Sequence, residues 1–257
     1  MTKESKNKKK SKRKRPPLLI ASGILLLLII SMLTLAFFYS EDETLNFFDI
    51  GKIDITLTET NWNPNRAVNI VPGTELAKNP QVINNEDLPV FVFIKVTVPY
   101  TEKSLEVSTG DNKGSTLATT PPMPLYKFGV WNETEQKYIY NESADQTQNY
   151  HDSDWKLVYP QPTVNTADQS LVYIFAHVNP SDTTKLIELA SGHTTGVPLF
   201  DSIKLVNINE ETIKERQGKD NNVTVEAYGI QTKYLESNNG TTYNPKTVWE
   251  KIEPHTP

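Results

Sequence analysis

Alternation of apolar and polar residues dominates the chain after residue 50. Apolar side chains occupy every second position over 53–58 and over 223–228, which predicts strands with one buried face. The segment 90–98 is apolar on both faces in its first half, and its second half places Lys95 and Thr97 in solvent. The segment 171–178 is apolar on both faces throughout, which predicts a strand at the centre of a sheet.

Turn residues separate these strands. Pro72 and Gly73 fit the central pair of a type II turn, whose second central residue needs a positive φ. The alternation slips at Gly229, which predicts a β-bulge there. Residues 101–124 are poor in large apolar side chains and residues 141–153 look similar, so both are predicted to be long loops.

One helix is predicted near the end of the chain. Asn244 fits the N-cap position and Pro245 the first helical position, while Val248, Trp249 and Ile252 share one face. Many short strands without alternating helices indicate an all-β fold with antiparallel strands. The pattern does not distinguish a β-sandwich from a barrel.

The first 40 residues differ sharply from the rest. Residues 1–15 hold nine Lys or Arg and one Glu, and residues 16–39 form an apolar segment long enough to cross a bilayer. Residues 16–257 hold 17 Lys or Arg against 30 Asp or Glu, a balance of −13. The positive-inside rule therefore predicts a cytoplasmic n-region at 1–15, a signal or transmembrane helix at 16–36 and an extracellular domain at 37–257.

Cleavage and retention of this apolar segment are both compatible with the residues. Thr34 and Ala36 supply acceptable residues at the −3 and −1 positions, which predicts cleavage by a signal peptidase between Ala36 and Phe37. The apolar run is longer than a usual signal peptide core, which favours an anchor inserted through residues 16–39. The basic run is also typical of a nucleic-acid tail, but the adjoining apolar segment explains it more simply, so no nucleic-acid partner is expected.

Nothing in the sequence is specific for catalysis. The chain has no Cys, which excludes a disulfide scaffold and thiol chemistry, and its four histidines form no metalloprotease motif. His177 is expected to be a core or edge residue and His193 a solvated loop residue. His151, Asp152 and Asp154 offer ligands for a surface cation, against the simpler interpretation of a polar turn. No catalytic, cofactor-binding or metal-binding residue is therefore predicted.

Several segments together resemble one bacterial family, the exported proteins with a SipW-dependent-type signal peptide, which include TasA-like and camelysin-like proteins. Each segment is weak alone, and their order and spacing are more specific. The segments are 35–44 (LAFFYSEDET), 46–59 (NFFDIGKIDITLTE), 71–73 (VPG), 78–84 (KNPQVIN), 198–205 (PLFDSIKL) and 225–231 (VEAYGIQ).

The resemblance implies cleavage by a dedicated signal peptidase, a jelly-roll-like β-sandwich and an extracellular location in a Gram-positive-type cell. The chain departs from the pattern in its longer basic stub and in its loops at 101–124 and 141–153, which are insertions relative to TasA. Some relatives carry a metallo-endopeptidase label, but no ligand set for a metal transfers to these residues.

Three functions follow as hypotheses. The first is a non-enzymatic structural protein of the cell surface or extracellular matrix, such as a biofilm fibre subunit or accessory protein, with self-association or a matrix protein as partner. The second is an extracellular binding module on an uncleaved anchor, and the third is a camelysin-like metallo-endopeptidase. Cleavage would free an aromatic-rich segment that either adds a strand to a neighbouring sandwich or stays with its own domain. Its large apolar residues are Phe37, Phe38, Tyr39, Leu45, Phe47 and Phe48.

Overall fold

A computed structural model describes most of the chain after residue 52. The described residues are 53–67, 70–102, 105–106, 116–117, 122–143, 145–207, 215–232, 235 and 243–252. They all belong to the second of two units, residues 52–257. The n-region predicted at 1–15, the signal or transmembrane segment predicted at 16–36 and the start of the extracellular domain lie outside the described residues.

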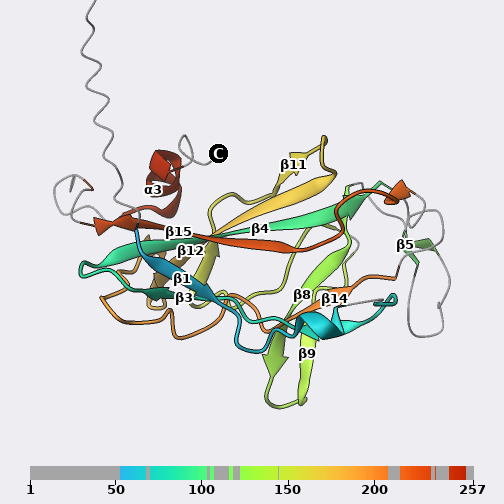
Figure 1. The fold of residues 1–257 in the computed structure, drawn as a ribbon, viewed down its shortest axis with the longest axis horizontal. Coiled ribbons are helices and arrows are strands. Elements are labelled where there is room, and N and C mark those ends of the chain that lie inside the picture. The colour runs from blue at the N-terminus through green and yellow to red at the C-terminus, as the bar shows by residue number, and fades with distance from the viewer. Residues whose placement is uncertain are drawn as a thin grey trace, which may run out of the picture. The chain divides into compact units, whose positions relative to one another are not determined.

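The larger sheet has seven strands and is antiparallel throughout (Figure 1). Its main path runs β10–β12–β4–β15, and three further strands pair with β12 or β4. The path strands are β10 (Trp155–Leu157), β12 (Ser170–Asn179), β4 (Val90–Thr101) and β15 (Thr224–Gln231). The additional strands are β7 (Met123–Pro124), β11 (Thr163–Asn165) and β13 (Asp182–Leu186).

A four-stranded antiparallel sheet lies against the inner face of the larger one (Figure 1). Its order is β2 (Glu75–Ala77), β14 (Ser202–Leu205), β8 (Tyr126–Asn132) and β9 (Lys137–Tyr140). Two smaller pairs are β1 (Ile55–Thr58) with β3 (Gln81–Asn84), and β5 (Leu105–Glu106) with β6 (Thr116–Leu117). A short 3-10 helix spans Pro64–Arg66.

The main core fills the space between the two sheets. Even-numbered residues of β4 meet odd-numbered residues of β12 across the ladder, and both point toward the smaller sheet. From that sheet Phe128 stacks on Phe200, with ring centroids 4.3 Å apart, and tilts against Phe175 of β12. This packing confirms an antiparallel β-sandwich and decides against a barrel.

A second core lies on the outer face of the larger sheet. Helix α3 (Pro245–Ile252) places Val248, Trp249 and Ile252 against Phe93, Ile174 and other residues of β4 and β12. Asn244 caps this helix by accepting hydrogen bonds from the N–H groups of Lys246 and Thr247. The predicted helix, its cap and its buried face are therefore confirmed.

Two local predictions have opposite outcomes. The type II turn at Pro72 and Gly73 is confirmed, because Gly73 has φ +82° and the Thr74 N–H donates to the Val71 carbonyl. The bulge at Gly229 is wrong, since β15 keeps one register against β4 from Thr224 to Gln231. Gly229 serves a close approach instead: a Cβ there would lie 3.1 Å from a methyl carbon of Ile53.

The two predicted loops also differ. Within 101–124, Thr101 ends β4, and the short strands β5, β6 and β7 occupy part of the remainder, so a loop without strands is wrong there. Met123 of β7 is fully buried. Over 141–143 and 145–153 no helix or strand forms. That segment still enters the core, because the Gln148 side chain is buried and bonds to the Phe128 N–H and the Tyr126 carbonyl.

In the described part of the chain, no helix has both the length and the apolar content needed to span a membrane. The candidate segment at 16–39 lies outside that part.

A close approach in β8 gives a testable prediction. A Cβ at Gly129 would lie 2.5 Å from Ser202 Oγ and 2.6 Å from a ring carbon of Tyr140. We expect Gly129→Ala to destabilise the domain by about 1–3 kcal/mol, the usual cost of overpacking, in urea unfolding. Ser202→Ala in the same background should restore part of the loss, whereas an unchanged midpoint in Gly129→Ala would contradict this packing.

Candidate functional site

The site residues predicted at the N-terminus lie outside the described residues. They are the cleavage pair Ala36 and Phe37 and the strand-donating residues Phe37, Phe38, Tyr39, Leu45, Phe47 and Phe48. The described chain begins at Ile53, and Ile53 packs beside Gly229 of β15. The segment that precedes Ile53 is therefore joined to the domain next to strand β15.

Strand β15 is the last strand on one side of the larger sheet, and Figure 1 shows it beside β4. The Thr232 N–H donates to the Pro89 carbonyl, which fixes the phase of the β15–β4 ladder. Because bonded and non-bonded pairs alternate in an antiparallel ladder, the even-numbered residues of β15 bond to β4. The odd-numbered residues, such as Val225 and Ala227, point their N–H and C=O groups away from β4. No backbone hydrogen bond joins these groups to another described segment.

His151 has a structural partner. Its Nε2 lies 2.9 Å from Asp201 Oδ2, and the same oxygen accepts the Trp131 N–H at 2.8 Å. Burial raises the pKa of Asp201, but the hydrogen bonds from His151 and Trp131 outweigh it and hold the pKa below its ordinary value. The pair ties the 145–153 segment to Asp201, which immediately precedes β14, and through Asp201 to β8.

His177 and His193 occupy the environments expected of them. His177 is 7% exposed and packs against the Trp155 ring, and its Nδ1 has no hydrogen-bond partner among the described residues. Burial lowers the pKa of His177 to about 4. His193 is exposed, and its Nδ1 lies 2.8 Å from the Ser191 carbonyl oxygen.

No metal-binding cluster assembles among the described residues. The residues considered as ligands for a surface cation, His151, Asp152 and Asp154, do not form a cluster of three His, Asp or Glu side chains in the described part of the chain. His177 and His193 do not join His151 in such a cluster either. His151 is committed to Asp201, and the Ser153 hydroxyl donates to Asp154.

Residues in the segments that resemble the exported family form internal contacts. Lys78 is buried, pairs with Glu59 at 2.7 Å and lies over the Trp62 ring at 4.4 Å. Asn79 accepts the Asn61 N–H. The segments 78–84 and 198–205 also meet directly. The Lys78 N–H donates to the Asp201 carbonyl, and the Leu199 N–H donates to the Pro80 carbonyl. These side chains hold β1, β2, β3 and β14 together and do not line an open site.

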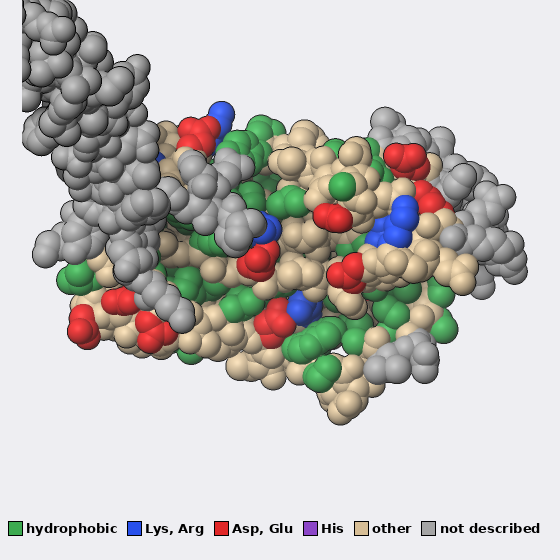
Figure 2. All heavy atoms as spheres, turned by 45° about the horizontal axis from the view of Figure 1, so that its top comes forward, with side chains coloured by type: hydrophobic (Ala, Val, Ile, Leu, Met, Phe, Trp, Pro, Cys, Tyr) green, Lys and Arg blue, Asp and Glu red, His purple; other side chains and the backbone are tan. Residues whose placement is uncertain are grey.

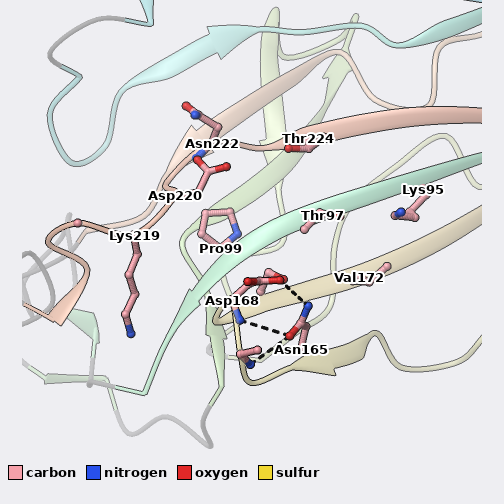
Figure 3. Close-up of a pocket in the computed structure, with 13 residues that line it drawn as sticks. Lys95, Thr97, Pro99, Asn165, Asp168, Val172, Lys219, Asp220, Asn222 and Thr224 are labelled. Carbon is pink, nitrogen blue, oxygen red and sulfur yellow. Dashed lines mark hydrogen bonds between the residues drawn. The ribbon is translucent and has the colours of Figure 1, made fainter. Parts of the chain in front are cut away.

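A groove of about 640 Å³ lies on the outer face of the larger sheet, beyond the part that α3 covers (Figure 3). Its floor comes from β4, β12 and β15, and its walls come from the turn after β11 and the loop before β15. The lining residues used below are Lys95, Thr97, Ser170, Val172, Thr224 and, on the walls, Asp168, Asp220 and Asn222.

Polar groups and apolar surface contribute about equally to the lining of this groove. Figure 3 shows Asp220, Asn222 and Thr224 on one side and Asn165 and Asp168 on the other. Lys95 on the floor is neutralised by Glu226, 2.7 Å away. Figure 2 shows acidic and basic side chains next to one another on this side of the molecule. The groove is therefore suited to hydrogen bonding with a ligand of little net charge.

The sequence did not indicate the groove, because its residues come from three distant segments, 95–99, 165–172 and 218–224. The only available signal was the change from apolar to polar residues on the outer face of β4, where Lys95 and Thr97 follow Phe91 and Phe93. Comparison with protein-family models, curated proteins and solved structures found no match to this chain.

The depressed pKa of His177 predicts a loss of stability in acid. The unfolded histidine has a pKa near 6.5 and the folded one about 4, so the unfolded state binds the proton first as the pH falls. The contribution of neutral His177 to the free energy of unfolding is fully present above about pH 6.5 and is lost as the pH falls toward 4. At 1.36 kcal/mol per pKa unit the loss is on the order of 3 kcal/mol.

Urea unfolding at about pH 7 and about pH 4.5 tests whether His177 causes the loss of stability in acid. We expect His177→Leu to remove most of the acid-dependent loss, and His193→Gln, at an exposed histidine, to leave it unchanged. Equal pH profiles for the wild type and His177→Leu would contradict the assignment.

Proposed function

We propose that this chain is an exported, non-enzymatic structural protein of the cell surface or extracellular matrix, which associates by adding a strand to its sandwich. The observation that carries the proposal is the outer edge of β15, with which no described backbone segment pairs. This strand has eight residues and a continuous register, with no Pro, no Lys and no bulge along it. Proteins usually protect an edge of this kind, because its unpaired N–H and C=O groups pair readily with another strand.

The proposed occupant of this edge is the segment 37–48 of a second copy. Ile53 lies against Gly229, so the segment is joined to its own domain close to the same edge strand. Leu45 and Phe47 are two residues apart and would lie on one face of an added strand, as Val225 and Ala227 do in β15. Added backbone hydrogen bonds would supply affinity, and the apolar side chains would extend the core.

Export supports the proposal from the sequence side. The basic stub, the apolar segment at 16–39 and the acidic remainder have the order expected of a secreted or surface-anchored chain. Before cleavage the segment 37–48 is attached to the membrane segment, and cleavage after Ala36 releases it. Processing by the signal peptidase would therefore control assembly.

The second candidate is a binding module on a retained anchor, and the groove on the outer face favours it. The third, a camelysin-like metallo-endopeptidase, gains no support within the described ranges, where no group of three His, Asp or Glu residues is close enough to hold a metal.

Export predicts a defined N-terminus. Mass spectrometry of the protein recovered from culture medium should show a chain that starts at Phe37, because Ala36 supplies the small residue before the cleaved bond. An intact N-terminus found only in the membrane fraction would favour the anchored binding module.

Assembly predicts a difference between two lengths of chain. We expect chains that begin at Phe37 to form oligomers or fibres and chains that begin at Asp49 to remain monomeric, as measured by light scattering at matched concentration. Equal behaviour of the two chains would contradict strand donation by residues 37–48.

The acceptor edge is tested separately in the longer chain. Ala227→Pro removes an N–H group that points away from β4, so it should reduce assembly while leaving the β15–β4 hydrogen bonds in place. Ala227→Ser keeps the N–H group and is the matched control. If Ala227→Pro remains folded and assembles as well as Ala227→Ser, β15 is not the acceptor.

A further inference from the structure

We propose that the groove on the outer face of the larger sheet binds a neutral or N-acetylated oligosaccharide through side-chain hydroxyl, amide and carboxylate groups. The inference does not depend on the assembly proposed above. The groove has a volume of about 640 Å³, which lies within the range of small-molecule sites, about 300–1,000 Å³. This volume suits a few linked sugar rings better than a single ion.

A buried hydroxyl on the groove floor has no partner. Ser170 is 6% exposed and lines the groove, and its Oγ has no hydrogen bond with any described residue. Buried polar groups in folded proteins are nearly always hydrogen-bonded, so an unpartnered one calls for an explanation. Because Ser170 Oγ has almost no accessible surface, a ligand reaches it only after the side chain rotates toward the groove, and the more accessible Thr97 and Thr224 supply the primary contacts.

Other polar groups of the groove are also available. The hydroxyls of Thr97 and Thr224 make no hydrogen bond within the described part of the chain, and the Asn222 side-chain amide makes none there either. Asp220 uses Oδ1 to accept the Asn222 N–H, and Asp168 uses Oδ2 to accept from Asn165. Each carboxylate therefore keeps one oxygen for a ligand. Hydroxyls that accept and donate, next to carboxylates that only accept, match the vicinal hydroxyls of a sugar.

The charges argue against an anionic ligand. Lys95 is paired with Glu226, whereas the Lys219 ammonium contacts the uncharged side-chain oxygen of Gln169 and keeps its charge. The carboxylates of Asp168 and Asp220 lie on the two walls. An anionic polymer would meet these two carboxylates with one unpaired lysine to balance them, so a ligand of little net charge fits better.

An extended peptide is a poorer fit than a saccharide. Strands β4 and β12 form most of the floor, and each is hydrogen-bonded to neighbours on both sides. The third floor strand, β15, has an edge that no described strand pairs with, but the groups on that edge point away from β4 and from the centre of the groove. Strand addition is the usual way a sheet binds a peptide, and it requires such an edge facing the ligand. Recognition here must therefore use side chains, and the apolar surface of Val172 is available to the C–H groups of a sugar ring.

The two walls are held in place by one buried cation. Arg216 is 3% exposed and donates from Nη1 to the Gln169 carbonyl at 3.0 Å, on the side of the β11–β12 turn. From Nε it donates to Asn221 Oδ1 at 2.9 Å, and from Nη2 to the Asp220 carbonyl, in the opposite wall. Preorganised walls reduce the entropy that a flexible, weakly held sugar would otherwise cost.

Titration calorimetry tests the proposal on the full chain, purified in a detergent without a sugar headgroup. The probes are cellotriose, maltotriose, mannotriose and chitotriose, with inorganic polyphosphate as the anionic comparison. We expect at least one trisaccharide to bind, and Thr97→Val and Thr224→Val each to weaken that binding about tenfold through the loss of a hydrogen bond.

The control is Thr183→Val on β13, which pairs with the opposite end of β12 and lies outside the groove. It should leave binding unchanged. The proposal is overturned if no trisaccharide binds at about 10 mM, if only polyphosphate binds, or if the groove variants and Thr183→Val behave alike. These outcomes leave the assembly of Phe37 chains unaffected, so the two proposals fail independently.

Discussion

The change of polarity along the outer face of β4 determines where the rest of the domain is covered and where it is open. Every even-numbered residue from Val90 to Val98 is buried in the core between the sheets. On the other face Phe91 and Phe93 are apolar and attract α3, which places Trp249 5.4 Å from the Phe93 ring. At Lys95 and Thr97 the same face becomes polar, the cover of α3 ends, and the groove begins. One strand therefore supports a closed core on one side and a half-open face on the other.

The elements that the sequence predicted well are those decided by local chemistry. The strands at 90–98 and 171–178, the type II turn at Gly73 and the capped helix from Pro245 all follow from side-chain periodicity or from a single backbone requirement. Their outcomes depend little on the rest of the chain. The bulge expected at Gly229 is the instructive error: the small residue is needed because Ile53, 176 positions earlier, packs there, and no local pattern contains that fact.

The candidate sites depend on contacts between distant segments, which explains why the sequence did not reveal them. The acidic neighbours of His151 in the sequence suggest a cation ligand, whereas its partner in the structure is Asp201, 50 residues away. The position of β15 at the edge of the described sheet follows from strand order, and strand order is not encoded in alternation. The groove needs β4, β12 and two loops at once. The sequence pattern indicates only its polar residues on β4, Lys95 and Thr97, which face solvent.

Thr224 belongs both to the floor of the groove and to the first position of β15, whose outer edge pairs with no described strand. The loop that leads into it, from Gly218 to Asn222, forms one groove wall and is held by Arg216. A ligand that restricts this loop also restricts the start of β15, and an added strand restricts the same residues from the other side. The two proposed sites therefore share the same few residues, and any coupling between them would be reciprocal: a ligand that favoured strand addition would itself bind more tightly to the assembled chain.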